Sequence, residues 1–200
     1  MIFLDGIQVM LLTWVICFYK AHSFNKCLKW DTSQVTNMHY MFFQAYDFNQ
    51  SLDFNTSKVI DMSYMFNEAI NFNENLNFTN TSNVTNIHKM FFNSSSFNKP
   101  LDIDTSNVVN MMGMFNKAYS FNQSLNFDTS KVKVMQYMFR NAQSFNQKLN
   151  FNTKKVYNSE DMYFNCPISD ENKPIFSIVK KHENNRKAIS RGGYRGAVRI

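Results

Sequence analysis

The chain has 200 residues, of which 44% are hydrophobic, and its 21 Lys and Arg against 15 Asp and Glu give a formal net charge of +6. Aromatic residues make up 16% of the sequence; because disordered chains are poor in them, the composition excludes an intrinsically disordered protein. The three scattered cysteines, Cys17, Cys27 and Cys166, lack the paired spacing of a disulfide framework or a zinc site, which excludes both classes.

The first predicted segment, residues 1–23, is a degenerate half-repeat. Its apolar stretch, residues 7–19, is interpreted as a buried part of the repeat array, with an export signal or a membrane anchor as the alternatives. Asp5 precedes the stretch and no Lys or Arg does, which disfavours a signal. The stretch is also shorter than the ~20 residues that a membrane-spanning helix needs. The residues that match the repeat are Leu11, Trp14, Cys17, Phe18 and Ala21.

The central segment, residues 24–166, repeats one pattern with a period of 24 or 25 residues. Each copy continues from a Phe-Asn pair to a Leu, an apolar or aromatic residue, Thr and Val at fixed offsets, as in "FNQSLNFDTSKV" from Phe121 to Val132. Self-similarity at this period is typical of stacked repeat arrays. The copies begin at Phe24, Phe48, Phe72, Phe97, Phe121 and Phe145.

Two apolar patterns inside each copy predict its local structure. Leu125 and Phe127 lie two residues apart, which predicts a short strand with one buried face. The next apolar residues, from Val35 to Ala45 in the first copy, have helical spacing. The Thr-Ser pair before them is predicted to cap the helix. The sequence therefore predicts an α/β solenoid of stacked 24–25-residue repeats, with a parallel strand ladder on one face and short helical segments on the other.

The Asn that follows each initial Phe has a predicted structural role. An Asn side chain can donate to and accept from backbone groups that a tight return leaves unpaired. Repeated at one position, these amides are predicted to form a ladder that bonds neighbouring repeats. They are Asn25, Asn49, Asn73, Asn98, Asn122 and Asn146.

The stretch "MFNKAYSFNQSLNFDTSKVKVM", Met114 to Met135, resembles the BspA-like leucine-rich-repeat family, and the resemblance covers residues 17–166. Such repeats occur in mycoplasma lipoproteins and other bacterial surface proteins, and also in protists and large DNA viruses. The resemblance implies a leucine-rich-repeat-like solenoid that binds other macromolecules, with a secreted or surface location. It brings no catalytic residues.

The last predicted segment, residues 167–200, is a basic tail. It holds eight Lys and Arg against Asp170, Glu171 and Glu183, so the rest of the chain is nearly neutral. The tail ends in "RGGYRGAVRI", and an Arg-Gly-Gly next to a Tyr can contact RNA by phosphate pairing and stacking. A solvated, flexible tail is the favoured interpretation, with nucleic-acid or polyanion binding as the alternative.

The sequence contains no pattern typical of an enzyme. His22, His39, His88 and His182 are interpreted as not recurring at one repeat position, and no nucleophile elbow, phosphate loop or metal cluster is found. We therefore expect a non-enzymatic protein with no cofactor and no metal.

The candidate binding surface is the line of residues that alternate with the buried strand positions. We call it the strip; it should be polar and weakly charged, and it would suit a protein or glycan partner. A fragment of a longer repeat array with no independent function is the remaining alternative. The strip comprises Lys29, Asp53, Asn77, Asp102, Asn126 and Asn150.

Overall fold

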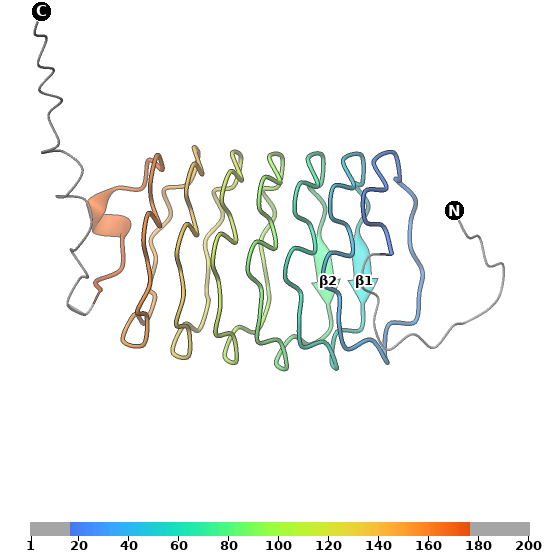
Figure 1. The fold of residues 1–200 in the computed structure, drawn as a ribbon, viewed down its shortest axis with the longest axis horizontal. Helices are drawn as coiled ribbons and strands as arrows, with labels where there is room; N and C mark the ends of the chain where they lie inside the picture. The colour runs from blue at the N-terminus through green and yellow to red at the C-terminus, as the bar shows by residue number, and fades with distance from the viewer. Residues whose placement is uncertain (1–16, 177–200) are drawn as a thin grey trace, which may run out of the picture.

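The computed structural model describes residues 17–176, in which successive copies of the repeat lie side by side along one axis (Figure 1). We call the copies coils 1 to 6. The regular elements are the strands β1 (Leu52–Phe54) and β2 (Leu76–Phe78) and the 3-10 helix η1 (Asp170–Asn172). The coils are residues 24–47, 48–71, 72–96, 97–120, 121–144 and 145–168.

Parallel backbone pairing joins the coils on two sides. β1 and β2 pair in parallel, with Leu52 opposite Leu76 and Asp53 opposite Asn77. On the other side of each coil, single parallel bridges link every coil to the next, from Asn37 in coil 1 to Asn158 in coil 6. The predicted parallel ladder is thus present as one short strand pair and one line of bridges.

The predicted helical segments are wrong: apart from η1, the part of the chain that the structure describes contains no helix. The Phe42 N–H donates to the Met65 carbonyl of the next coil at 2.8 Å, whereas the Ala45 N–H donates back to the Phe42 carbonyl at 3.1 Å. Gln44, the third residue of that turn, has φ 55°, and Tyr40 has φ 58°. Left-handed residues interrupt an α-helix, so this segment is a run of tight turns that share their hydrogen bonds with the neighbouring coil.

The Thr-Ser pairs do not cap helices. Thr105 Oγ1 donates to the Asp128 carbonyl of the next coil at 3.1 Å, and the Ser106 N–H donates to Asp104 Oδ1 at 2.8 Å. The second bond is an Asx turn, a side-chain mimic of a backbone turn. All six repeat Thr hydroxyls donate to a carbonyl 22 to 24 residues further on, so this position connects the coils.

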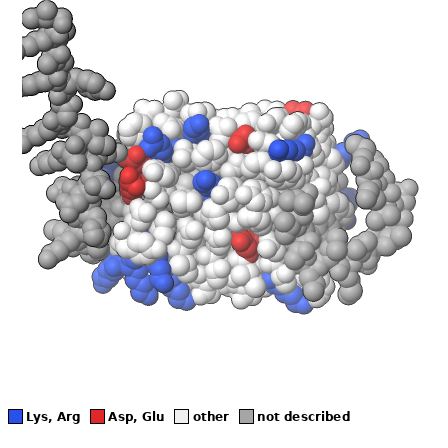
Figure 2. Space-filling view, in the orientation of Figure 1, with Lys and Arg blue, Asp and Glu red and all other residues white. Residues whose placement is uncertain are grey.

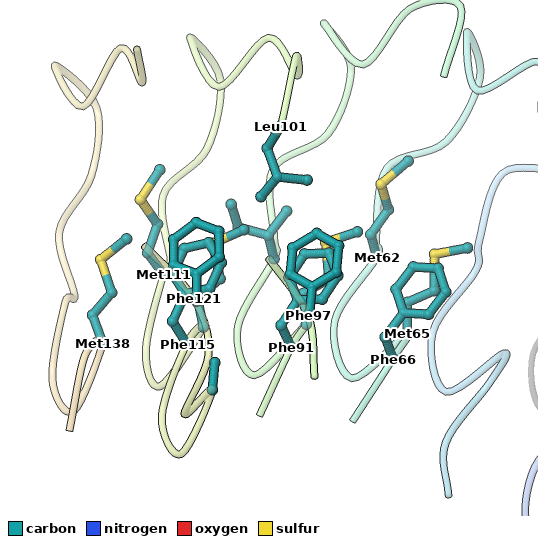
Figure 3. Close-up of a cluster of buried hydrophobic side chains, with 14 of the residues drawn as sticks. Met62, Met65, Phe66, Phe91, Phe97, Leu101, Met111, Phe115, Phe121 and Met138 are labelled. Atoms are coloured by element: carbon teal, nitrogen blue, oxygen red, sulfur yellow. The ribbon is translucent and has the colours of Figure 1, made fainter. Parts of the chain in front are cut away.

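The core consists of two parallel stacks of Phe rings, part of which Figure 3 shows. Within coil 4 and its predecessor, Phe91 stacks on Phe97 at 4.1 Å between ring centroids, and Phe91 stacks on Phe115 of the next coil at 5.8 Å. These rings are fully buried, and burying a Phe contributes about 1.5–3 kcal/mol. Met side chains such as Met62 and Met111 pack beside them.

The predicted Asn ladder is confirmed. Asn49 Oδ1 accepts the backbone N–H of Asn73 at 2.8 Å, and Asn73 Oδ1 accepts the N–H of Asn98 at 2.9 Å. The second step spans the coil with one extra residue, yet the bond keeps its length. The insertion is therefore absorbed between Phe78, which still pairs with β1, and Thr81.

Both ends of the array contain residues from the predicted flanking segments. Phe18 stacks on Phe42 at 5.4 Å, as expected for a half-repeat, whereas Leu11 and Trp14 lie outside the described residues. At the other end the Ser169 N–H donates to Asn146 Oδ1 at 2.8 Å and Ile168 is buried. The beginning of the predicted tail is thus packed against coil 6, and residues 177–200 lie outside the described part. None of the helices in residues 17–176 could span a membrane.

Candidate functional site

The strip is exposed along its whole length. All six residues predicted for it are solvent-exposed. Asp53 and Asn77 lie opposite each other in the β1–β2 pair, and their neighbours Leu52 and Phe54 are fully buried. In coil 1 the apolar partner is less covered, since Trp30 is 36% exposed. The structure therefore brings the strip residues into one line, with paired strands about 4.8 Å apart.

The polar atoms of the strip are free of partners within the chain. Among residues 17–176, no hydrogen bond or ion pair of the strip side chains is found in any coil. The other recurring Asn positions are used: Asn55 Oδ1 accepts the Ser57 N–H at 3.1 Å, and Asn86 Oδ1 accepts the His88 N–H at 3.3 Å. The strip thus keeps its full capacity to donate and accept hydrogen bonds for a partner.

The carboxylates at the Asx turns have a different role from those of the strip. Hydrogen bonds from Ser106 lower the pKa of Asp104, and hydrogen bonds from Ser130 lower the pKa of Asp128. A hydrogen bond to the ionised form favours that form. These carboxylates are therefore occupied as acceptors in their own turns, and Asp53 and Asp102 of the strip are the ones available to a partner.

The sequence interpretation missed a second surface, which we call the aromatic corner. Tyr40 stacks on Tyr64 at 4.5 Å between centroids, and Tyr19 stacks on Phe43 at 4.9 Å. Lys89 Nζ lies 5.3 Å from the Tyr64 ring centroid, within the range of a cation–π contact. The recurrence of aromatic residues here was readable, but the incorrect helix assignment placed them on different faces.

The aromatic corner also corrects the interpretation of the histidines. His39 and His88 occupy equivalent positions in coils 1 and 3, each directly before a left-handed residue, Tyr40 or Lys89. Tyr64 lies between them, with its ring centroid 5.7 Å from His39 and 4.6 Å from His88. Two histidines therefore do recur at one repeat position.

The His39–Ser63 pair has the spacing of a nucleophile and its base but not the accessibility. His39 Nδ1 lies 2.6 Å from Ser63 Oγ, but Ser63 is fully buried. A nucleophile must reach its substrate, so the contact is structural. Among the described residues no group of three or more His, Cys, Asp or Glu could hold a metal ion.

Comparison with known families identifies one match. The model of the family described as "Mycoplasma protein of unknown function, DUF285" matches residues 14–103 and again residues 79–177. The two overlapping matches span the half-repeat, all six coils and η1. No curated protein and no solved structure matches the chain.

Proposed function

Since the chain belongs to this Mycoplasma family of unknown function, we propose that it is a non-enzymatic binding protein whose strip recognises a protein or a glycan. The observation that carries the proposal is the contrast between the recurring polar positions. The Asn ladder and the Asx turns use their side chains within the chain, and the strip does not. Unpaired, aligned amides and carboxylates suit the hydroxyls of a sugar or the polar groups of a protein surface.

The proposal includes a solenoid architecture of the leucine-rich-repeat-like kind, as the BspA-like resemblance implies. It is supported by the parallel bridges between every pair of neighbouring coils and by the Asn and Thr hydrogen bonds that repeat with the same step. In such arrays each repeat contacts only its neighbours, and the aligned surface residues form an extended binding face. A secreted or surface location would fit this role, and protease treatment of intact cells should then release peptides of the chain.

The test uses the full chain on a glycan array and on a panel of immobilised cell-surface proteins. The strip variant is Asn77→Arg with Asn126→Arg, which places two bulky charges in coils 3 and 5. The control is Ser120→Arg with Ser144→Arg, two exposed positions off the strip. We expect the strip variant to lose the binding that the wild type shows, with an unchanged melting temperature, while the control keeps it.

The opposite result would remove the strip from the proposal. If the strip variant binds as well as the control, the strip is not the recognition surface. A third variant, Tyr40→Ser with Tyr64→Ser, then shows whether the aromatic corner carries the binding instead.

A further inference from the structure

Four exposed lysines lie together at the turns of the last two coils. We call this group the lysine edge: Lys131, Lys133, Lys154 and Lys155. Figure 2 shows Lys and Arg gathered at the lower left border of the molecule, on the side of the C-terminal coils, with no Asp or Glu among them in that view. The charge of the described part is therefore concentrated at one end of one edge.

The register of the coils places these cations close together. Lys131 and Lys155 are 24 residues apart and hold the same position in coils 5 and 6. The Tyr157 N–H donates to the Lys133 carbonyl at 3.0 Å, which fixes the two coils side by side at this point. Neighbouring parallel segments lie about 4.8 Å apart, and like charges directly opposite each other are unfavourable. An anion from outside the chain would relieve this repulsion.

The chain itself does not neutralise the lysine edge. The ion pairs among residues 17–176 are Arg140–Asp161 and Lys173–Asp170, and neither includes a lysine of the edge. Lys131 Nζ reaches the neutral amide oxygen of Asn107. The carboxylate of the same turn, Asp128, accepts the Ser130 N–H.

Exposed apolar side chains accompany the lysines. Tyr157 is 67% exposed and Ile175 is 91% exposed. Thr153 Oγ1 donates to the Ile175 carbonyl at 2.6 Å, so the backbone of residue 175 is held next to the turn that bears Lys154. From this point the sequence continues "FSIVKK", and residues 177–200 contain seven Lys and Arg against Glu183. The basic tail is thus attached directly beside the lysine edge.

We propose that the lysine edge is a docking surface for a membrane that carries anionic phospholipids. Lysines near such a surface pair with headgroup phosphates, and clusters of four or more favour anionic lipid. Tyr and Ile next to them suit the boundary between headgroups and acyl chains. A nucleic-acid backbone offers no apolar partner for Ile175, so the membrane is the occupant that the combination favours. This site is separate from the strip and does not depend on it.

The test measures co-sedimentation of the full chain with vesicles of pure phosphatidylserine and of pure phosphatidylcholine. The edge variant replaces Lys131, Lys133, Lys154 and Lys155 with Gln. The control makes the same change at four lysines elsewhere and has the same net charge. The control positions are Lys26, Lys58, Lys99 and Lys117.

We expect wild type and control to bind phosphatidylserine and not phosphatidylcholine. Since each lysine near the surface is worth about five-fold in affinity, the edge variant should bind phosphatidylserine at least about 100-fold more weakly. Tyr157→Ser with Ile175→Ser should also weaken vesicle binding, by about ten-fold, and leave binding of a single-stranded oligonucleotide unchanged.

Two results would overturn the proposal. Equal vesicle binding by the edge variant and the control would assign the affinity to the overall charge or to residues 177–200. Loss of oligonucleotide binding in the edge variant with unchanged vesicle binding would identify a nucleic-acid site instead. Because the strip residues are intact in every variant, neither result affects the proposed binding role of the strip.

Discussion

Asn49 and Asn73 are joined across two coils by a single bond, in which the side-chain oxygen of Asn49 accepts the backbone N–H of Asn73 at 2.8 Å. Asn73 then does the same for Asn98 at 2.9 Å. Each Asn is both the acceptor for the next coil and the donor to the previous one. The ladder therefore supplies partners for one backbone N–H per coil that the strands and bridges leave unpaired.

Asn73→Ala should remove the acceptor and leave the Asn98 N–H without its partner. We expect a loss of about 1–3 kcal/mol in the free energy of unfolding, measured by urea titration. Asn73→Asp keeps an acceptor oxygen and should recover most of the loss. Asn126→Ala on the strip, which removes no hydrogen bond, should change stability by less than about 0.5 kcal/mol. An equal effect of Asn73→Ala and Asn126→Ala would contradict the role of the ladder.

Phe97→Ala should destabilise the protein by about 3–5 kcal/mol, because it leaves a cavity in the centre of a ring stack. Phe97 is fully buried and contacts the rings of Phe91 and Phe121. Phe164→Ala is the control, since Phe164 is 54% exposed. Thermal unfolding followed by circular dichroism checks both, and a smaller loss at Phe97 than at Phe164 would refute the packing argument.

Lys117→Gly should stabilise the protein by about 1 kcal/mol, because a residue with a Cβ is strained in the left-handed region and Gly is not. Lys117 has φ 61°. At Lys99, which is not among the residues with positive φ, the same change should destabilise through the larger conformational entropy of Gly in the unfolded chain. Urea titration of both variants decides the point, and a loss of stability at both sites would argue against relieved strain.

His88 should make the stability depend on pH. Burial lowers the pKa of His88 from its ordinary value of 6.5; Asp61 opposes this, and Lys89 and His39 lower the pKa further. Because the folded state disfavours the imidazolium, the contribution of His88 is fully present above pH 6.5 and is lost as the pH falls through the folded pKa.

His88→Gln should flatten the fall in unfolding free energy as the pH drops below about 6.5. Gln136→Ala is the matched control, since Gln136 holds the equivalent position in coil 5 and does not titrate. The control should follow the wild-type pH curve. A wild-type slope in His88→Gln would show that His88 does not contribute.

The sequence predicted the stacking and the strip better than the path of the chain between them. The Phe-Asn period and the two-residue alternation of Leu52 and Phe54 report burial, and burial is what repeats in the structure. The segment from Val35 to Ala45 failed because its apolar spacing also fits a run of turns. Its left-handed positions hold Tyr40 and Gln44, residues with no preference for that conformation, so no local signal marked them.

The partners of the hydrogen bonds were less predictable than the buried positions. The Thr hydroxyls were expected to cap a helix within their own repeat, but they donate to the next coil, as Thr105 does to Asp128. The aromatic corner was missed for the same reason. Contacts such as Tyr40 with Tyr64 depend on the spacing between coils, which a single repeat does not reveal.

The extra residue of coil 3, absorbed between Phe78 and Thr81, means that length and register are separable in this array. The ladder bond from Asn73 to Asn98 has the same length as those across 24-residue coils, so the insertion does not propagate. The turn after each strand is thus a permissive site, where evolution or an engineer could graft a loop onto one edge of the molecule. Such grafts would display new chemistry at a chosen height along the stack without a redesigned core.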